Sequence, residues 1–156
     1  MLTHIQQYST TDISTAGGVR SADPPKDEPE NRHAEIDGYN FDLSFDRPVI
    51  REKETAAGNL HITAPDGAAC KHLEVVMGAF GHFVGFCEDF LTVLHVHPVQ
   101  PATFPQESMG GPELPFYFRS VEPGTVRLFT QVKIDGKDLF PRFVVKVQPL
   151  RAAAAE

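Results

Sequence analysis

The chain has 156 residues, 41% of them hydrophobic and 22% charged, which suits one globular domain with a core of ordinary size. Its formal net charge of −7 argues against a nucleic-acid-binding surface and against attachment to anionic lipid, because both need clustered basic side chains. No apolar run reaches the roughly 18 to 20 residues of a membrane-spanning helix, so we expect no membrane insertion.

The two ends of the chain differ in composition from its middle. Residues 1–34 are rich in Ser, Gly, Pro and charge, which predicts a flexible polar tail because little can be buried there. Residues 150–156, ending in "RAAAAE", predict a disordered C-terminal tail. The start, "MLTHIQQYSTTDIS", lacks the basic and apolar regions of a secretory signal. We therefore expect a cytosolic protein, or a processed or excised piece of a longer one, with a folded domain over residues 35–149.

Between the tails, short strands alternate with turn signals. "YNFDLSFD" (39–46) alternates apolar and polar residues, and "GNLHITA" (58–64) does the same, as expected of half-buried strands. Asp135-Gly136 predicts a type I′ hairpin turn, and Pro141 should lie at a bulge or on an unpaired edge. Further strands are predicted at 72–77, 79–86, 91–97, 113–120, 125–134 and 137–147.

This pattern of about seven or eight strands without a convincing helix predicts an all-β fold, an antiparallel β-sandwich of immunoglobulin-like kind. The chain contains no Trp, so the Cys–Trp–Cys spacing of antibody domains is absent. Its two cysteines, Cys70 and Cys87, allow either one disulfide or two buried thiols.

The stretch "GHFVGFCEDFLTVLHVHP" (81–98) holds His82, His95 and His97 among apolar residues. A hairpin loop of two or four residues around Glu88-Asp89 places His82 opposite His95, with His97 on the same face two residues further on. A one-residue change in loop length would move His82 to the other face. Three neutral imidazoles on one rigid face suit Cu(II), Zn(II) or Ni(II). The alternative is that the three histidines are ordinary hydrogen-bonded residues at a strand edge.

Other side chains could join this site. Met77 precedes the His82 strand, and the long 98–113 segment could fold back and offer Met109 or Glu113. Thioether ligands would favour Cu(I), whereas the alternative role of both methionines is packing. The remaining histidines offer less. His61 is expected in solvent on the polar face of its strand, His72 lies in a turn-rich region, and His4 and His33 belong to the tail.

These residues carry a family resemblance. "LEVVMGAFGHFVGFCEDFLTVLHVHP", followed by "GGPELPFYF" and "PGTVRLFTQVKIDGKDLFPRFVVKV", resembles a family of bacterial extracytoplasmic immunoglobulin-like domains with a GHxV…LHVHP motif. The resemblance covers about residues 39–148 and is most specific over 73–98. It implies a sandwich fold, a periplasmic or extracellular location, and a link to heavy-metal or copper handling through His82, His95 and His97.

We therefore expect a metal-binding module that holds copper, or alternatively zinc, for delivery, buffering or sensing, with a metal-handling or cell-surface protein as a possible partner. The alternative is a structural or interaction domain without metal. Enzymatic activity is not expected, because no hydrolase or phosphate-loop motif is present. Zinc-type hydrolysis or redox chemistry at the three histidines would need an acid nearby. Glu88 and Asp89 lie about 20 Å away along the strand, so Glu113 alone could serve.

Overall fold

The computed structural model describes residues 27–89, 91–101 and 105–151, without the side chains of His95 and His97. In that part of the chain all regular structure is β, and no helix long and apolar enough to cross a membrane occurs. Of the tails predicted at 1–34 and 150–156, residues 1–26 and 152–156 lie outside the described residues.

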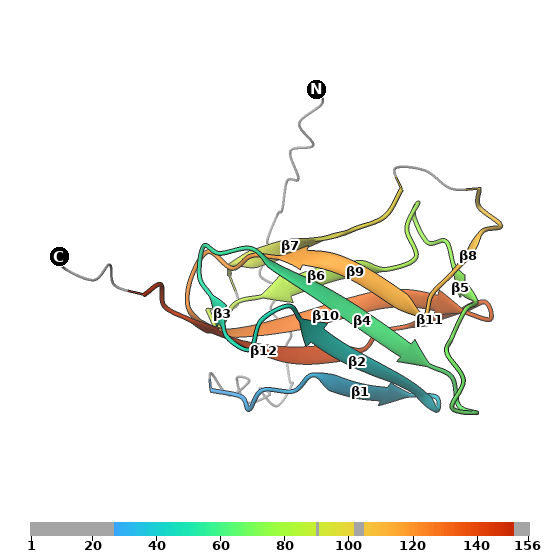
Figure 1. Ribbon diagram of the computed structural model, residues 1–156, viewed down its shortest axis with the longest axis horizontal. Helices are drawn as coiled ribbons and strands as arrows, with labels where there is room; N and C mark the ends of the chain where they lie inside the picture. The colour runs from blue at the N-terminus through green and yellow to red at the C-terminus, as the bar shows by residue number, and fades with distance from the viewer. Residues whose placement is uncertain (1–26, 90, 102–104, 152–156) are drawn as a thin grey trace, which may run out of the picture.

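Two sheets face each other and form the predicted β-sandwich (Figure 1). Sheet B contains, in spatial order, β1 (His33–Ile36), β2 (Tyr39–Phe45), β4 (Ala56–Thr63), β9 (Glu113–Phe118) and β7 (Val93–Pro98). Sheet A continues from β7 through β6 (His82–Phe86), β10 (Gly124–Ile134), β12 (Arg142–Gln148) and β3 (Ile50–Arg51). Short strands at one end of β10 are β5 (Leu73–Glu74), β8 (Met109–Gly110) and β11 (Lys137–Leu139). The twelve strands of the described residues exceed the expected seven or eight because several are only two to four residues long.

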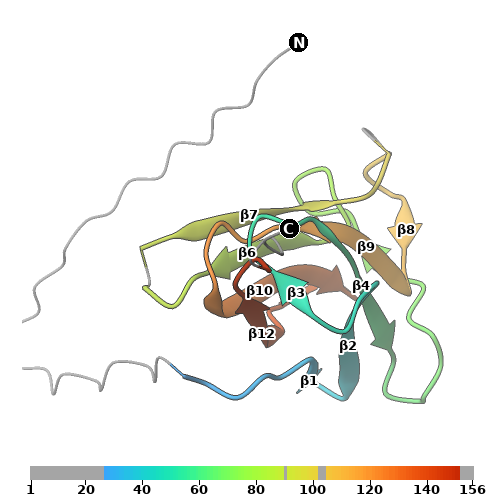
Figure 2. The same cartoon turned by 60° about the vertical axis from the view of Figure 1, so that its left-hand side comes forward.

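One strand belongs to both sheets. β7 pairs with β6 in sheet A and, through its last residues, with β9 in sheet B. Figures 1 and 2 show β7 along one border of the molecule and β1 along the opposite border. The two sheets are therefore joined at the β7 side, and the C-terminal end of β7 lies at this junction.

The strand signals of the sequence have the expected physical basis. In β2, Phe41 and Leu43 are buried while Asp42 and Ser44 are exposed, as their alternation predicts. Asp135 and Gly136 both have positive φ, 51° and 77°, which confirms the two-residue hairpin turn. Pro141 lies in the break between β11 and β12, because proline cannot donate to a ladder.

The core between the sheets is built around phenylalanines. Phe41, Phe116, Phe118 and Phe143 are all fully buried. The Phe116 ring packs against the Phe83 ring of the other sheet, with centroids 4.7 Å apart. Burial of each such side chain contributes about 1.5–3 kcal/mol, so these contacts fix how the two sheets face each other.

Residues 27–34 form part of the fold, although their composition predicts a flexible tail. Asn31 exchanges two backbone hydrogen bonds with Val144 of β12, at 3.0 and 2.8 Å, and His33 begins β1. The N-terminal segment therefore connects the free side of β12 to β1, and the circuit of strands closes. Composition missed this because the segment is held by backbone pairing and ion pairs rather than by apolar burial.

Candidate functional site

The hairpin that carries the three histidines has a register two residues away from the predicted one. Phe83 pairs with Val96 and Val84 pairs with His95, and the Cys87 amide donates to the Thr92 carbonyl at 2.9 Å. The prediction that His82 lies opposite His95 is therefore wrong. The physical reason is the loop, in which the Asp89 carboxylate accepts hydrogen bonds from both the amide and the hydroxyl of Thr92.

This loop includes Leu91, which was expected in the strand. The Leu91 amide donates to Asp89, and its side chain is 79% exposed. The loop thus runs from Glu88 to Leu91, and the strands meet two residues later than predicted. A carboxylate that accepts from the amides two and three residues onward builds its own turn, a local effect that the hydrophobic pattern does not show.

The two-residue difference keeps the histidine positions on one side of the sheet. Side chains alternate with a period of two, so a shift of two preserves the face whereas a shift of one reverses it. The ladder ends at the pair of Phe83 and Val96, and the next residues of the two strands are His82 and His97, with His95 two residues before His97. Continued by one position, this register sets His82 opposite His97. It therefore assigns the three histidine positions to one face at one end of the hairpin.

This side of the hairpin is the outer face of sheet A. Along β6, Phe83 and Gly85 are buried in the core, whereas His82, Val84 and Phe86 are half-buried. The Phe86 ring packs edge-on against Phe129 of β10, at 5.9 Å between centroids. The histidine positions thus adjoin an apolar strip that is only partly covered.

A backbone carbonyl fixes the His82 ring. His82 Nε2 lies 2.7 Å from the carbonyl oxygen of Val76, and a carbonyl can only accept, so Nε2 donates. In the neutral ring, Nδ1 then carries the free lone pair. Val76 and Ala79 close a tight turn through two backbone hydrogen bonds, 2.7 and 3.0 Å. This turn therefore positions the imidazole.

Met77 lies at the tip of that turn. Its φ is +46° and its side chain is 75% exposed, so packing does not explain its presence there. A methionine with positive φ is uncommon and is a strained choice for this position. Among the three suggested additional ligands, Met77 belongs to the turn that holds His82.

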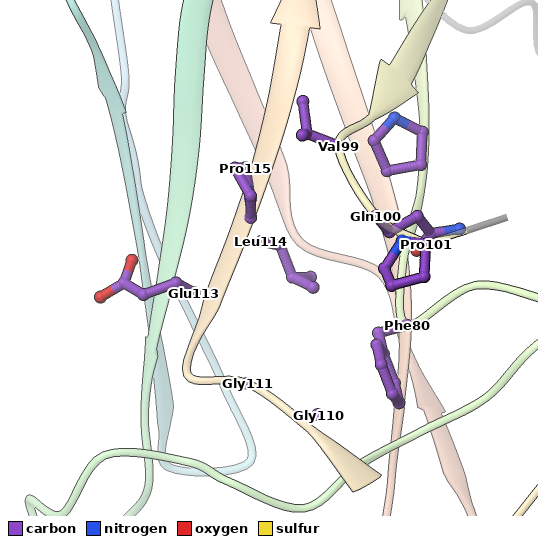
Figure 3. A pocket seen from close by; sticks show the side chains of 10 residues that line it. Phe80, Val99, Gln100, Pro101, Gly110, Gly111, Glu113, Leu114 and Pro115 are labelled. Carbon is purple, nitrogen blue, oxygen red and sulfur yellow. The ribbon is translucent and has the colours of Figure 1, made fainter. Parts of the chain in front are cut away.

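The other two suggested ligands lie elsewhere. Met109, 61% exposed, lies in β8 opposite Glu74. Glu113 begins β9, four residues before Tyr117 and therefore about 13 Å along the strand from the partner of His97. Figure 3 shows its carboxylate turned away from the hollow beside it.

Tyr117 and Gln131 flank the histidine positions and were not found by sequence reasoning. Tyr117 of β9 pairs with His97, and Gln131 of β10 pairs with His82. Tyr117 is 55% exposed. These neighbours depend on which distant strands meet β6 and β7, and no local pattern in the sequence contains that information.

A second set of histidines lies on the outer face of sheet B. His33, Asp42, His61 and Glu113 are directly opposed in turn across β1, β2, β4 and β9. His33 Nδ1 lies 2.8 Å from Asp42 Oδ1, and His61 Nδ1 lies 2.5 Å from Glu113 Oε1. His61 therefore lies against a carboxylate as well as solvent, and His33 belongs to a strand rather than to a tail.

The Glu113 carboxylate is held from two sides. Burial raises its pKa, but hydrogen bonds from Asn59 and His61 outweigh burial and leave the pKa below its ordinary value. Glu113 is therefore ionised at neutral pH and engaged within sheet B. This arrangement does not favour a role at the His97 end of β9.

A hollow of about 180 Å³ opens between residues 98–101 and the start of β9 (Figure 3). Its walls are mainly apolar, with Phe80, Pro98, Leu114 and Pro115 among the lining residues. At its rim β7 and β9 are still hydrogen-bonded, because the Val99 amide donates to the Pro115 carbonyl at 2.7 Å.

The two cysteines are free and buried in the core. Burial raises the pKa of both thiols, that of Cys87 to about 12, so both stay protonated at neutral pH. Among the side chains that the structure describes, no three His, Cys, Asp or Glu gather as metal ligands, and those of His95 and His97 lie outside that description.

Comparison with known families gives one match. The model of a domain of unknown function (DUF8832) matches residues 34–149, which is more than half of the chain and includes β2 to β12 and all three histidines of the hairpin. Comparison with curated proteins gives no match. The family description names neither an immunoglobulin-like relation nor a metal. The chain therefore belongs to the DUF8832 family, and the matched residues begin within β1.

Proposed function

We propose that the domain binds a transition-metal ion through His82, His95 and His97 and serves in metal delivery, buffering or sensing. The β6–β7 register supports this proposal, because Val84 pairs with His95 and the ladder ends at Phe83 and Val96, next to His82 and His97. Copper is the favoured ion and zinc the alternative, since imidazole sites bind Cu(II) more tightly than Zn(II).

The setting of His82 supports this proposal. Metal-binding histidines commonly donate their second ring N–H to a carbonyl or carboxylate, which fixes the ring and its tautomer. The Val76 carbonyl is such a partner for His82 and leaves Nδ1 free to bind an ion.

The outer-face location suits exchange of the ion with a partner. The histidine positions lie at the border of sheets A and B, beside the exposed Tyr117 and near the turn of the exposed Met77. An ion held there would be reachable from outside the core. We infer a carrier or sensor rather than an enzyme, because the suggested acid, Glu113, lies away from the histidine positions and is bound by His61 and Asn59.

Isothermal titration of the full chain with Cu(II) and Zn(II) tests the proposal. We expect saturable binding of one ion per chain, weaker at acidic pH because imidazole must be neutral to ligate. His82→Ala and His97→Ala should each lower the affinity by at least ~10–100-fold, the range already produced by loss of outer-shell partners.

His61→Ala is the matched control, because His61 is an outer-face histidine of the other sheet with a carboxylate partner. Its affinity for the ion should equal that of the unchanged protein. Absence of binding by the unchanged protein, or equal losses in His61→Ala and His82→Ala, would overturn the proposal. A structural or interaction domain without metal would then be the better description.

A further inference from the structure

An arginine on the outer face of sheet A is almost completely buried. Arg127 of β10 pairs with Phe86 on one side and Val144 on the other, yet it is only 3% exposed. The guanidinium is always charged at physiological pH, and burying it is costly unless an anion accompanies it. The fold therefore places an obligatory anion site on this face.

Among the described residues, the Glu28 carboxylate occupies that site. Glu28 Oε2 lies 3.1 Å from Arg127 Nε. Both carboxylate oxygens of Glu28 lie 2.6–2.7 Å from Arg142 Nη2. Convergence of two guanidinium groups on one carboxylate is a strong, charge-assisted arrangement. Hydrogen bonding from Arg142 holds the pKa of Glu28 below its ordinary value despite the opposing effect of burial.

A third basic side chain extends the site along β12. Lys146 Nζ contacts Asp27 Oδ1 at 2.6 Å and Thr125 Oγ1 at 3.0 Å. The Thr125 amide also meets Glu88 at 3.3 Å, so one further carboxylate borders the site. Three basic side chains thus receive the carboxylates of Asp27 and Glu28.

The basic and acidic halves belong to different kinds of structure. Arg127, Arg142 and Lys146 lie on β10 and β12, two long and extensively paired strands. The acidic half belongs to residues 27–32, which we call the N-terminal strap, and whose backbone is joined to β12 through Asn31 and Val144. The receiving half is therefore preformed on the sandwich, whereas the occupant is a short segment at its edge.

We propose that Arg127, Arg142 and Lys146 form a carboxylate-binding site that the N-terminal strap occupies in cis. The site would take a carboxylate from either of two sources, a small free carboxylate or an acidic extended segment that also pairs with β12. This site is separate from the three-histidine end of the hairpin and does not depend on metal binding.

Chemical rescue tests the proposal. Glu28→Ala in the full chain should lower the midpoint of thermal unfolding, followed by circular dichroism. Sodium acetate should restore the midpoint more than sodium chloride at equal ionic strength, whereas the unchanged protein should respond equally to both salts. If Glu28→Ala folds poorly, refolding yield in acetate against chloride gives the same comparison, and Glu28→Gln provides a second variant of nearly unchanged shape.

Glu30→Ala is the matched control, because Glu30 lies in the same strap but contacts only Arg32 in the described hydrogen bonds and ion pairs. It should show no selective response to acetate. A peptide with the sequence of residues 27–33 and blocked ends distinguishes the two sources. Rescue at lower concentration than acetate, lost when Gln replaces its Glu28, indicates an acidic segment, and rescue by acetate alone indicates a small carboxylate. No selective rescue of either Glu28 variant by acetate or peptide would overturn the proposal.

Discussion

The outer faces of the two sheets both carry histidines, but with different neighbours. On sheet B, His33 and His61 are each directly opposed to a carboxylate and lie 2.8 and 2.5 Å from it. On sheet A, His82 pairs with Gln131 of β10, and its ring is hydrogen-bonded to the backbone carbonyl of Val76. The same residue type therefore has two different environments about one core.

The difference concerns what occupies one ring nitrogen of each histidine. His33 and His61 each have a ring nitrogen against a carboxylate of the neighbouring strand. His82 has a ring nitrogen against the neutral Val76 carbonyl instead. This contrast is why the metal-binding proposal concerns sheet A.

The largest expected effect is on the free energy of unfolding. It arises at the buried glycines of the two strands that carry His61 and His82. A Cβ on Gly58 in β4, the His61 strand, would lie 2.2 Å from the Phe116 ring. A Cβ on Gly85 in β6, the His82 strand, would lie 3.1 Å from Val126 and 3.3 Å from Leu94. We expect Gly58→Ala to cost about 1–3 kcal/mol or more in the free energy of unfolding, because the stacked ring must move. Gly85→Ala should change the free energy of unfolding by less than about 1 kcal/mol. Alanine is more favourable than glycine inside a strand, and this gain offsets the tighter contact of the added methyl group.

Urea unfolding of the two variants measures this contrast directly. Equal losses in the free energy of unfolding would show that both sheets tolerate the added methyl group alike and that the Phe116 ring can move aside. A smaller loss for Gly58→Ala than for Gly85→Ala would contradict the packing of Phe116 against Phe83.

A moderate effect is expected at the loop that sets the register of the sheet A histidines. Asp89→Ala removes the acceptor for the Thr92 and Leu91 amides. We expect faster amide hydrogen exchange at Thr92 and Cys87 and weaker metal binding, with exchange in β4 unchanged. Unaltered exchange at Thr92 would show that Asp89 does not hold the register.

Hydrogen bonds from Thr92 and Leu91 hold the pKa of Asp89 below its ordinary value. Its stabilising contribution is therefore present above the ordinary Asp pKa of about 3.9 and is lost as the pH falls through the lowered value. The thermal midpoint of Asp89→Ala and of the unchanged protein should converge in strong acid.

The smallest effect is expected for the sheet B ion pair. Glu113→Gln should lower stability by no more than about 1 kcal/mol at neutral pH, because this pair is half-exposed and screened. The pKa of Glu113 is lowered in the folded state, so the difference from Glu113→Gln should persist above about pH 5 and shrink as the pH falls below the ordinary Glu pKa of about 4.3. The metal affinity of Glu113→Gln should equal that of the unchanged protein. A lower affinity would show that Glu113 contributes to the same site as His82.

Much of the fold follows from local patterns in the sequence. The alternation in residues 39–46 and the Asp135-Gly136 turn are each determined by neighbouring residues, and each appears where expected. Short-range chemistry of this kind can be read directly from the chain.

What could not be predicted depends on side-chain hydrogen bonds or distant pairings. With the hydrogen bonds of Asp89, the hairpin register differs by two residues from the predicted one. The ion pair of Glu28 with Arg142 attaches a segment that was predicted to be a tail to the sandwich. The facing of His61 and Glu113 requires β4 and β9 to be neighbours, although 52 residues separate the pair. The three-histidine set thus stays a prediction, while its hairpin register and its neighbours Tyr117 and Gln131 could not be predicted from the sequence.

The closed circuit of strands has a consequence for the behaviour of the chain among copies of itself. An open strand edge presents unsatisfied amides and carbonyls on which another chain can add a strand and begin to aggregate. Here Asn31 covers the β12 backbone at Val144, and β3 covers it at Val147 and Gln148. Loss of the N-terminal segment would expose a valine-rich edge of β12 to strand addition by another copy of the chain. We therefore expect this segment to hinder aggregation as well as to complete the fold.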